Sequence, residues 1–240
     1  MKRAIIMRTK GRIVVFLFVL ACSTPALANE EHDSLLFHAF LFEGDYGQSD
    51  GRPTGSWDLD GWIGGDYNKL WLKSEGESNN NKMEQAEFWA MYSRNIATFW
   101  DAQIGIRHDV TPTSETYAVL GFGGLAPYFF DTEAHLFISQ SGDVSIRLRE
   151  ENDFLITQRL IIQPYLEANF FAQKVDKQER SVGLAYGEAG LLTRYEITRK
   201  FAPYIDLRYE RKFGETATIA KSNGEDIGSF IVAVGLRLMF

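Results

Sequence analysis

Apolar and polar side chains alternate with a period of two along much of the chain after residue 28. The final segment is the clearest case. One of its faces carries Phe230, Val232, Val234, Leu236, Leu238 and Phe240. The other face carries Ser229, Ile231, Ala233, Gly235, Arg237 and Met239. Successive side chains of a β-strand point to opposite faces, so this pattern predicts strands. A helix would spread the charged positions of such segments over all of its sides.

About twelve segments share the alternation. The expected strands are residues 33–43, 56–64, 67–76, 84–93, 99–109, 116–124, 127–138, 142–152, 159–172, 183–196, 201–212 and 228–240. Each approaches the ~9–11 residues that a tilted strand needs to cross a bilayer. An even number of strands is typical of bacterial barrels. The predicted fold class is therefore all-β, a single-chain transmembrane antiparallel β-barrel of about 12 strands.

Polar, turn-prone stretches separate these segments, and the longer ones are expected to be extracellular loops. They are residues 44–55, 76–82, 111–114, 141–143, 174–180 and 214–228. Aromatic residues make up 14% of the chain. Many stand near the expected strand ends, which predicts girdles at the two membrane interfaces. These aromatic positions are Trp57, Trp62, Trp89, Phe99, Trp100, Tyr117, Tyr128, Phe129, Phe201 and Tyr204. The terminal Phe240 also resembles the assembly signal of outer-membrane barrels. The alternative is a soluble β-sandwich whose last strand ends there.

Residues 1–28 have the features of a secretory signal peptide. A basic region precedes the apolar run Ile13–Ala21, and Ala26-Leu27-Ala28 forms a small-x-small cleavage signature. The expected domains are a signal peptide at residues 1–28 and an outer-membrane barrel at residues 29–240. An alternative is lipidation at Cys22, which follows a lipoprotein-like sequence.

The net charge of −7 includes a leader with five basic residues and no acid, so the remainder is near −12. An acidic body repels phosphates, which argues against nucleic acid as a partner. The only cysteine is Cys22, in the leader. The mature body therefore has neither a disulfide framework nor a cysteine-based metal site.

The expected lumen-facing positions collect charges of both signs. They include Lys73, Glu75, Asp101, Arg107, Asp109, Asp131, Glu133, His135, Arg147, Arg149, Glu151, Glu167, Glu188, Arg194, Glu196, Asp206, Arg208 and Glu210. Two interpretations stay open. The charges either pair with one another and fill a narrow barrel, or they line a polar path that attracts cations.

Only four histidines occur, and His135 shares a strand face with Asp131 and Glu133. Imidazole and carboxylate groups are metal ligands, so these three residues and His32 are the metal-site candidates. No Gly-x-Ser-x-Gly motif is present, and no serine, histidine and acid form an evident catalytic group. An enzyme is therefore not expected, although a lipid hydrolase is kept as an alternative.

Several strings run in order through the mature chain. They include residues 57–66, 69–77, 92–94, 99–101, 124–128, 157–160, 166–169, 194–196, 201–204, 210–214 and 224–226. Together they resemble the bacterial copper resistance protein B family of outer-membrane proteins. The resemblance implies an outer-membrane barrel, in contact with lipid, that assists copper resistance by export or sequestration of copper ions. It also implies pairing with a periplasmic multicopper oxidase.

One departure from the family pattern stands out. Many members carry a Met- and His-rich segment ahead of the barrel, thought to bind copper. Here only Glu30, Glu31, His32 and Asp33 follow Asn29 before the expected barrel. The alternative function is a small passive porin or structural barrel without direct copper handling.

Overall fold

Long antiparallel strands dominate the computed structural model, which describes residues 36–175 and 178–240. The strands are β1 (Phe37–Ser49), β2 (Arg52–Gly64), β3 (Asn68–Asn79), β4 (Lys82–Ala97), β5 (Trp100–Thr111), β6 (Glu115–Ala126), β7 (Phe130–Ser139), β8 (Val144–Glu151), β10 (Leu160–Phe171), β11 (Gly183–Tyr195), β12 (Phe201–Lys212) and β13 (Gly228–Met239). Smaller elements are the two-residue strand β9 (Phe154–Leu155), the 3₁₀ turn η1 (Pro127–Phe129) and the helix α1 (Gly214–Ser222).

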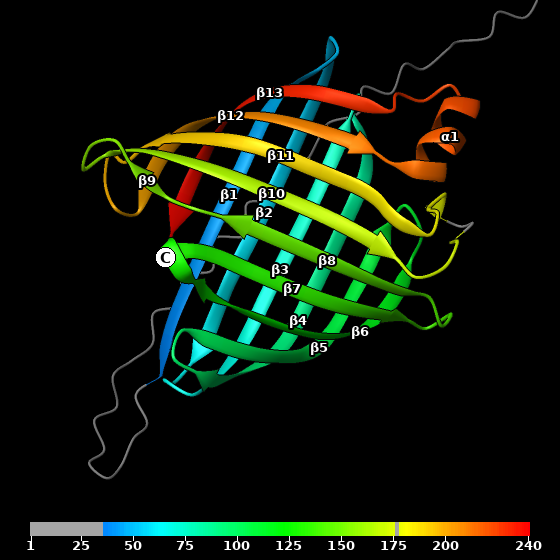
Figure 1. The fold of residues 1–240 in the computed structure, drawn as a ribbon. Coiled ribbons are helices and arrows are strands. Elements are labelled where there is room, and N and C mark those ends of the chain that lie inside the picture. Colours follow the sequence, from blue (N-terminus) through cyan, green and yellow to red (C-terminus); the bar gives the residue numbers. More distant parts are fainter. Residues whose placement is uncertain (1–35, 176–177) are drawn as a thin grey trace, which may run out of the picture. The chain divides into compact units, whose positions relative to one another are not determined.

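Each long strand pairs with its neighbour in sequence, and the sheet closes on itself where β1 pairs with β13 (Figure 1). The closing register runs from Leu41 opposite Met239 to Ser49 opposite Ile231. Closure gives each of the twelve long strands a paired neighbour on both sides, as a membrane-spanning sheet requires. The prediction of a 12-stranded antiparallel barrel is confirmed. The predicted signal peptide, residues 1–28, lies outside the described residues.

The expected loop at residues 44–55 is wrong, because this stretch forms the paired ends of β1 and β2. Asp50 and Gly51 alone make the turn, with φ angles of 49° and 78°. This left-handed pair matches the two-residue hairpin turns that favour Asp-Gly. The expected strand at 127–138 begins later, because η1 occupies its first residues. The expected loop at 214–228 contains α1.

The two ends of the barrel differ in the length of their connections. The end that holds the start of β1 and the end of β13 has mostly short turns, such as residues 65–67 and 98–99. The opposite end has the longest connections, residues 172–182 and 213–227 (Figure 1). Bacterial barrels place short turns in the periplasm and long loops outside the cell. These ends are called the periplasmic and extracellular ends below.

Helix α1 covers nine residues of the connection between β12 and β13. Within the described residues, no helix has both the length and the apolar character that a membrane span needs.

The outward face is apolar and the inward face is polar, as the alternation predicts. Ile104, Ile106, Val232 and Val234 are exposed on the outside, whereas Arg147 and Arg208 are buried inside. An exposed apolar band around a closed barrel is the surface that lipid covers. The protein is therefore an outer-membrane β-barrel.

Replacing Val234 with arginine is expected to destabilise the barrel by about 2–4 kcal/mol, because a guanidinium group would enter the acyl-chain region. Val234 lies midway along β13 and is 60% exposed. The measurement is reversible unfolding in phospholipid vesicles. Ser222→Arg, at the exposed end of α1, is the control and should change the free energy of unfolding little. An equal fall in the free energy of unfolding of both variants would contradict a lipid-covered outer face.

Candidate functional site in the barrel lumen

The described residues line at least two cavities in the lumen. Cavity 1 has a volume of about 500 Å³ and lies towards the periplasmic end, where Phe99 and Leu125 line it. Cavity 2 has a volume of about 160 Å³ and lies towards the extracellular end, with Glu77 and Glu188 in its lining. Four residues line both cavities: Glu43, Asp58, Arg149 and Glu151. These shared residues mark the boundary between the two spaces.

Ion pairs cross the lumen at this boundary. Arg149 Nη1 lies 3.1 Å from Asp58 Oδ2. Their strands, β8 and β2, are six positions apart in either direction around the twelve long strands. The pair therefore joins opposite walls. Lys73 adds a second bridge, with its Nζ 2.5 Å from Glu133 Oε1 and 2.7 Å from Asp60 Oδ2. These ion pairs therefore span the lumen at the level where the two cavities adjoin.

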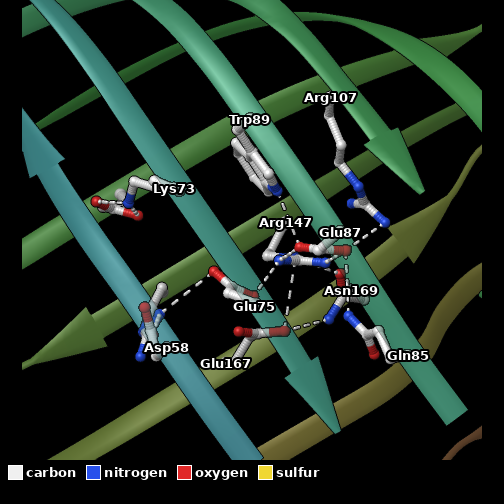
Figure 2. Close-up of polar contacts among 12 residues, drawn as sticks. Asp58, Lys73, Glu75, Gln85, Glu87, Trp89, Arg107, Arg147, Glu167 and Asn169 are labelled. Carbon is white, nitrogen blue, oxygen red and sulfur yellow. Dashed lines mark hydrogen bonds and ion pairs between the residues drawn. The ribbon is translucent and has the colours of Figure 1, made fainter. Parts of the chain in front are cut away.

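Glu87 occupies the centre of a second group of ion pairs (Figure 2). Its side chain is fully buried, and its oxygens lie 2.7 Å from Arg107 Nη2 and 2.8 Å from Arg147 Nη1. The indole N–H of Trp89 donates a third contact at 3.0 Å. Arg147 also contacts Glu75 at 3.0 Å. Charge-assisted hydrogen bonds of this kind hold buried ions in fixed positions.

An apolar cluster fills the lumen beside Glu87. It comprises Trp89, Met91, Tyr117, Val119 and Phe137, all buried. The guanidinium of Arg107 stacks over the Phe137 ring at 4.9 Å, and that of Arg147 over the Trp89 ring at 5.4 Å. Cation–π contacts of this type supplement the ion pairs. The interior is therefore packed on this side.

The cluster corrects part of the predicted aromatic girdle. Trp89, Tyr117 and Tyr204 are buried in the lumen and are not exposed at the interfaces. Their inward direction follows from strand parity, which places Trp89 on the same face as Glu87. Phe99, Tyr128 and Phe129 do lie exposed at the periplasmic end. The aromatic content therefore has two roles, at the interfaces and in the lumen.

Segments of the extracellular end fold against the barrel opening. The side-chain amide of Gln178 donates to the Tyr117 hydroxyl at 2.6 Å. The backbone N–H of Ser181 donates to the Thr216 hydroxyl at 2.9 Å, which ties the β10–β11 connection to α1. Both Ser181 and Thr216 are buried. Through these contacts, the described segments of the extracellular end cover part of the lumen.

The predicted metal residues lie in different surroundings. His135 is 2% exposed, and its Nε2 is 2.7 Å from Gln103 Oε1. Glu133 is held by Lys73, whereas Asp131 lines cavity 1. His32 lies outside the described residues. Among the described residues, no three His, Cys, Asp or Glu side chains are placed to hold one metal ion together. Assignment of a metal to these residues therefore stays a prediction.

The alternation of residues identified many of the charged side chains that face the lumen. It missed several others that the structure places there. The missed residues are Glu43, Asp45, Asp58, Asp60, Lys69, Glu77, Glu87 and Glu115. Glu87 shares its face with Trp89 and Met91, so both faces of β4 are largely apolar in sequence. Asp45 and Asp58 lay in or beside the stretch taken for a loop. One expected lumenal residue, Glu196, instead lies beyond β11 and pairs with Arg199 at 3.3 Å.

Comparisons with known proteins give a consistent result. A family model described as copper resistance protein B precursor matches residues 37–240. Copper resistance protein B of Escherichia coli is 40% identical over 211 residues, spanning 87% of this chain and 71% of that protein. A copper resistance protein B homolog of Pseudomonas syringae pv. tomato is 37% identical over 222 residues, spanning 92% and 76%.

Two porins of solved structure share the fold. The NanC porin superposes with a TM-score of 0.58 at 13% identity, covering 83% of this chain and 98% of its own. The KdgM porin gives 0.54 at 9% identity, covering 83% and 99%. At these identities the likeness concerns the barrel architecture alone.

Proposed function

Because this chain belongs to the copper resistance protein B family, we propose that it contributes to copper resistance by admitting copper ions into a divided, acidic lumen. Copper is here a cargo that the barrel sequesters or exports. Entry is from the periplasmic end, where cavity 1 lies. The observation that carries the proposal is the pair of lumenal cavities separated by cross-lumen ion pairs.

Cavity 1 is suited to a cationic cargo. Its lining includes Asp58, Asp60, Asp131, Glu133 and Glu151. Lys73 and Arg149 balance part of this charge. A concave, low-dielectric space with excess negative charge raises the local concentration of cations. Asp131 makes no hydrogen bond or ion pair with another described side chain, which leaves its carboxylate available to a cargo ion.

His135, Glu133 and His32 complete the proposed copper contacts. His135 lies two residues from Glu133 on the inward face of β7, behind the cavity lining. Recruiting its imidazole would require exchange of the hydrogen bond to Gln103. The proposed partners are outer-membrane lipid and a periplasmic multicopper oxidase. The barrel acts by binding and passage and forms no covalent intermediate.

A deletion strain is expected to lose copper tolerance and to recover it when the wild-type gene is supplied. Growth across a copper gradient is the measurement, with zinc as the control stress. Failure of the wild-type gene to restore tolerance would contradict the resistance role.

The purified barrel in a planar lipid bilayer is expected to conduct ions much less than the NanC porin, because ion pairs cross its lumen between the two cavities. Planar-bilayer recording is the measurement. A steady, unselective conductance would instead support the passive porin.

A further inference from the structure

Five carboxylates surround one guanidinium group in cavity 2. Arg208 Nη1 lies 3.3 Å from Asp45 Oδ2 and 3.0 Å from Asp206 Oδ2. Its Nε lies 3.5 Å from Glu210 Oε1. Glu77 and Glu188 line the same cavity. This set is called the Arg208 cluster below. One positive charge faces five acidic groups.

The other lumenal cations nearby are already engaged. Arg149 pairs with Asp58, Glu75 and Glu151, and Arg147 with Glu75, Glu87 and Glu167. Arg180 stacks over the Tyr186 ring at 5.7 Å and does not line the cavity. A buried excess of negative charge is costly unless a cation or protons balance it.

Two buried oxygen atoms in the cluster lack a partner. Asp45 Oδ1 and Asp206 Oδ1 receive no hydrogen bond from the described residues. Their side chains are 6% and 4% exposed, and both residues line cavity 2. A carboxylate oxygen left unsatisfied at this depth costs about 1–3 kcal/mol or more. Native proteins rarely leave such atoms alone without an ion or water.

Glu77 is a further carboxylate in the lining of cavity 2. It forms no hydrogen bond or ion pair with another residue in the described part of the chain. Glu188 receives a long hydrogen bond from the Tyr186 hydroxyl at 3.3 Å. Several carboxylates thus line one cavity with acceptor capacity to spare.

We propose that cavity 2 binds a hydrated divalent cation of the hard, oxygen-preferring class. Its described lining contains carboxylates, tyrosine hydroxyls and amides, but no His, Met or Cys. Such oxygen ligands suit Mg²⁺, Ca²⁺ or Mn²⁺ rather than Cu⁺. No three acids are placed to hold a bare ion. A volume of about 160 Å³ instead accommodates an ion with part of its water shell, at ~30 Å³ per water.

The cation would have a structural consequence. It would supply positive charge beside the carboxylates of Asp45 and Asp206, which line the cavity. The proposal does not depend on copper handling, since the cluster lies in the cavity away from the periplasmic end. A hard cation here would hold β1, β3, β11 and β12 together from inside the barrel.

The test measures binding of Mn²⁺ to the refolded barrel in detergent micelles, by the loss of the free-ion electron paramagnetic resonance signal. We expect saturable binding to the wild type that is displaced by Mg²⁺ or Ca²⁺. Glu77→Gln should weaken Mn²⁺ binding at least about tenfold, because one carboxylate charge facing the ion is lost. Glu77 has no partner to lose, so the variant should fold.

Asp66→Asn is the control, since it removes one exposed carboxylate from the turn between β2 and β3, away from cavity 2. It should leave Mn²⁺ binding unchanged. Absence of saturable binding to the wild type would overturn the proposal and leave protons to balance the charge. Equal weakening by both variants, or no effect of Glu77→Gln, would also overturn it. So would binding of spermidine without binding of Mn²⁺. Copper tolerance is a separate readout, so failure here is distinguishable from failure of the proposed function.

Discussion

Replacing Glu87 with alanine is expected to destabilise the barrel by about 3–5 kcal/mol, since two guanidinium groups would stay buried without their shared carboxylate. The Glu87 oxygens lie 2.7 Å from Arg107 and 2.8 Å from Arg147. Both arginines stack over aromatic rings, and their side chains are only 12% and 9% exposed. The measurement is equilibrium unfolding by guanidinium chloride in vesicles, followed by tryptophan fluorescence.

Two variants separate the charge from other effects of the substitution. Glu84→Ala, on the same strand but exposed, should leave the free energy of unfolding nearly unchanged. Glu87→Gln keeps the side-chain volume and an acceptor for the Trp89 indole. The fall in its free energy of unfolding should therefore lie between those of Glu87→Ala and Glu84→Ala. If Glu87→Ala were as stable as Glu84→Ala, the buried ion pairs would not stabilise the lumen.

The barrel itself could be predicted because lipid and lumen impose opposite chemistry on alternate residues. Val232 and Val234 face outwards, while Ile231 and Ala233 are buried between them, as the alternation required. The expectation of a loop at residues 44–55 was wrong for a reason of the same physical origin. Asp45, Gly47 and Ser49 are polar or small because they face the lumen, and this composition is also typical of a loop.

The lumenal contacts could be predicted only in part. Parity placed Arg147 and Arg149 inside, since β8 alternates cleanly between charged and apolar residues. Their partners depend on which strands oppose each other after closure, and single strands do not encode that information. Asp58 and Arg149 are 91 residues apart in sequence yet join opposite walls. Glu87 stayed hidden because inward aromatic packing gives β4 two apolar faces.

Replacing Arg149 with alanine is expected to join the two cavities and to raise cation conductance well above that of the wild type. Arg149 lines both cavities, and its guanidinium bridges to Asp58 at 3.1 Å. The substitution shortens the side chain at the boundary between the two cavities. It also leaves Asp58, Glu75 and Glu151 without this positive charge. Acidic groups along a widened path favour cations over anions. Planar-bilayer recordings in potassium chloride gradients measure both conductance and selectivity.

Two further variants decide whether the bridge itself is responsible. Arg149→Lys keeps the positive charge and most of the length, so it should restore much of the low wild-type conductance. Arg159→Ala, at an exposed position of the periplasmic end, removes the same charge without touching the lumen and should conduct like the wild type. If Arg149→Ala conducted no more than Arg159→Ala, the Asp58–Arg149 bridge would not be the barrier between the cavities. The division of the lumen would then depend on the packed cluster around Trp89 and Phe137.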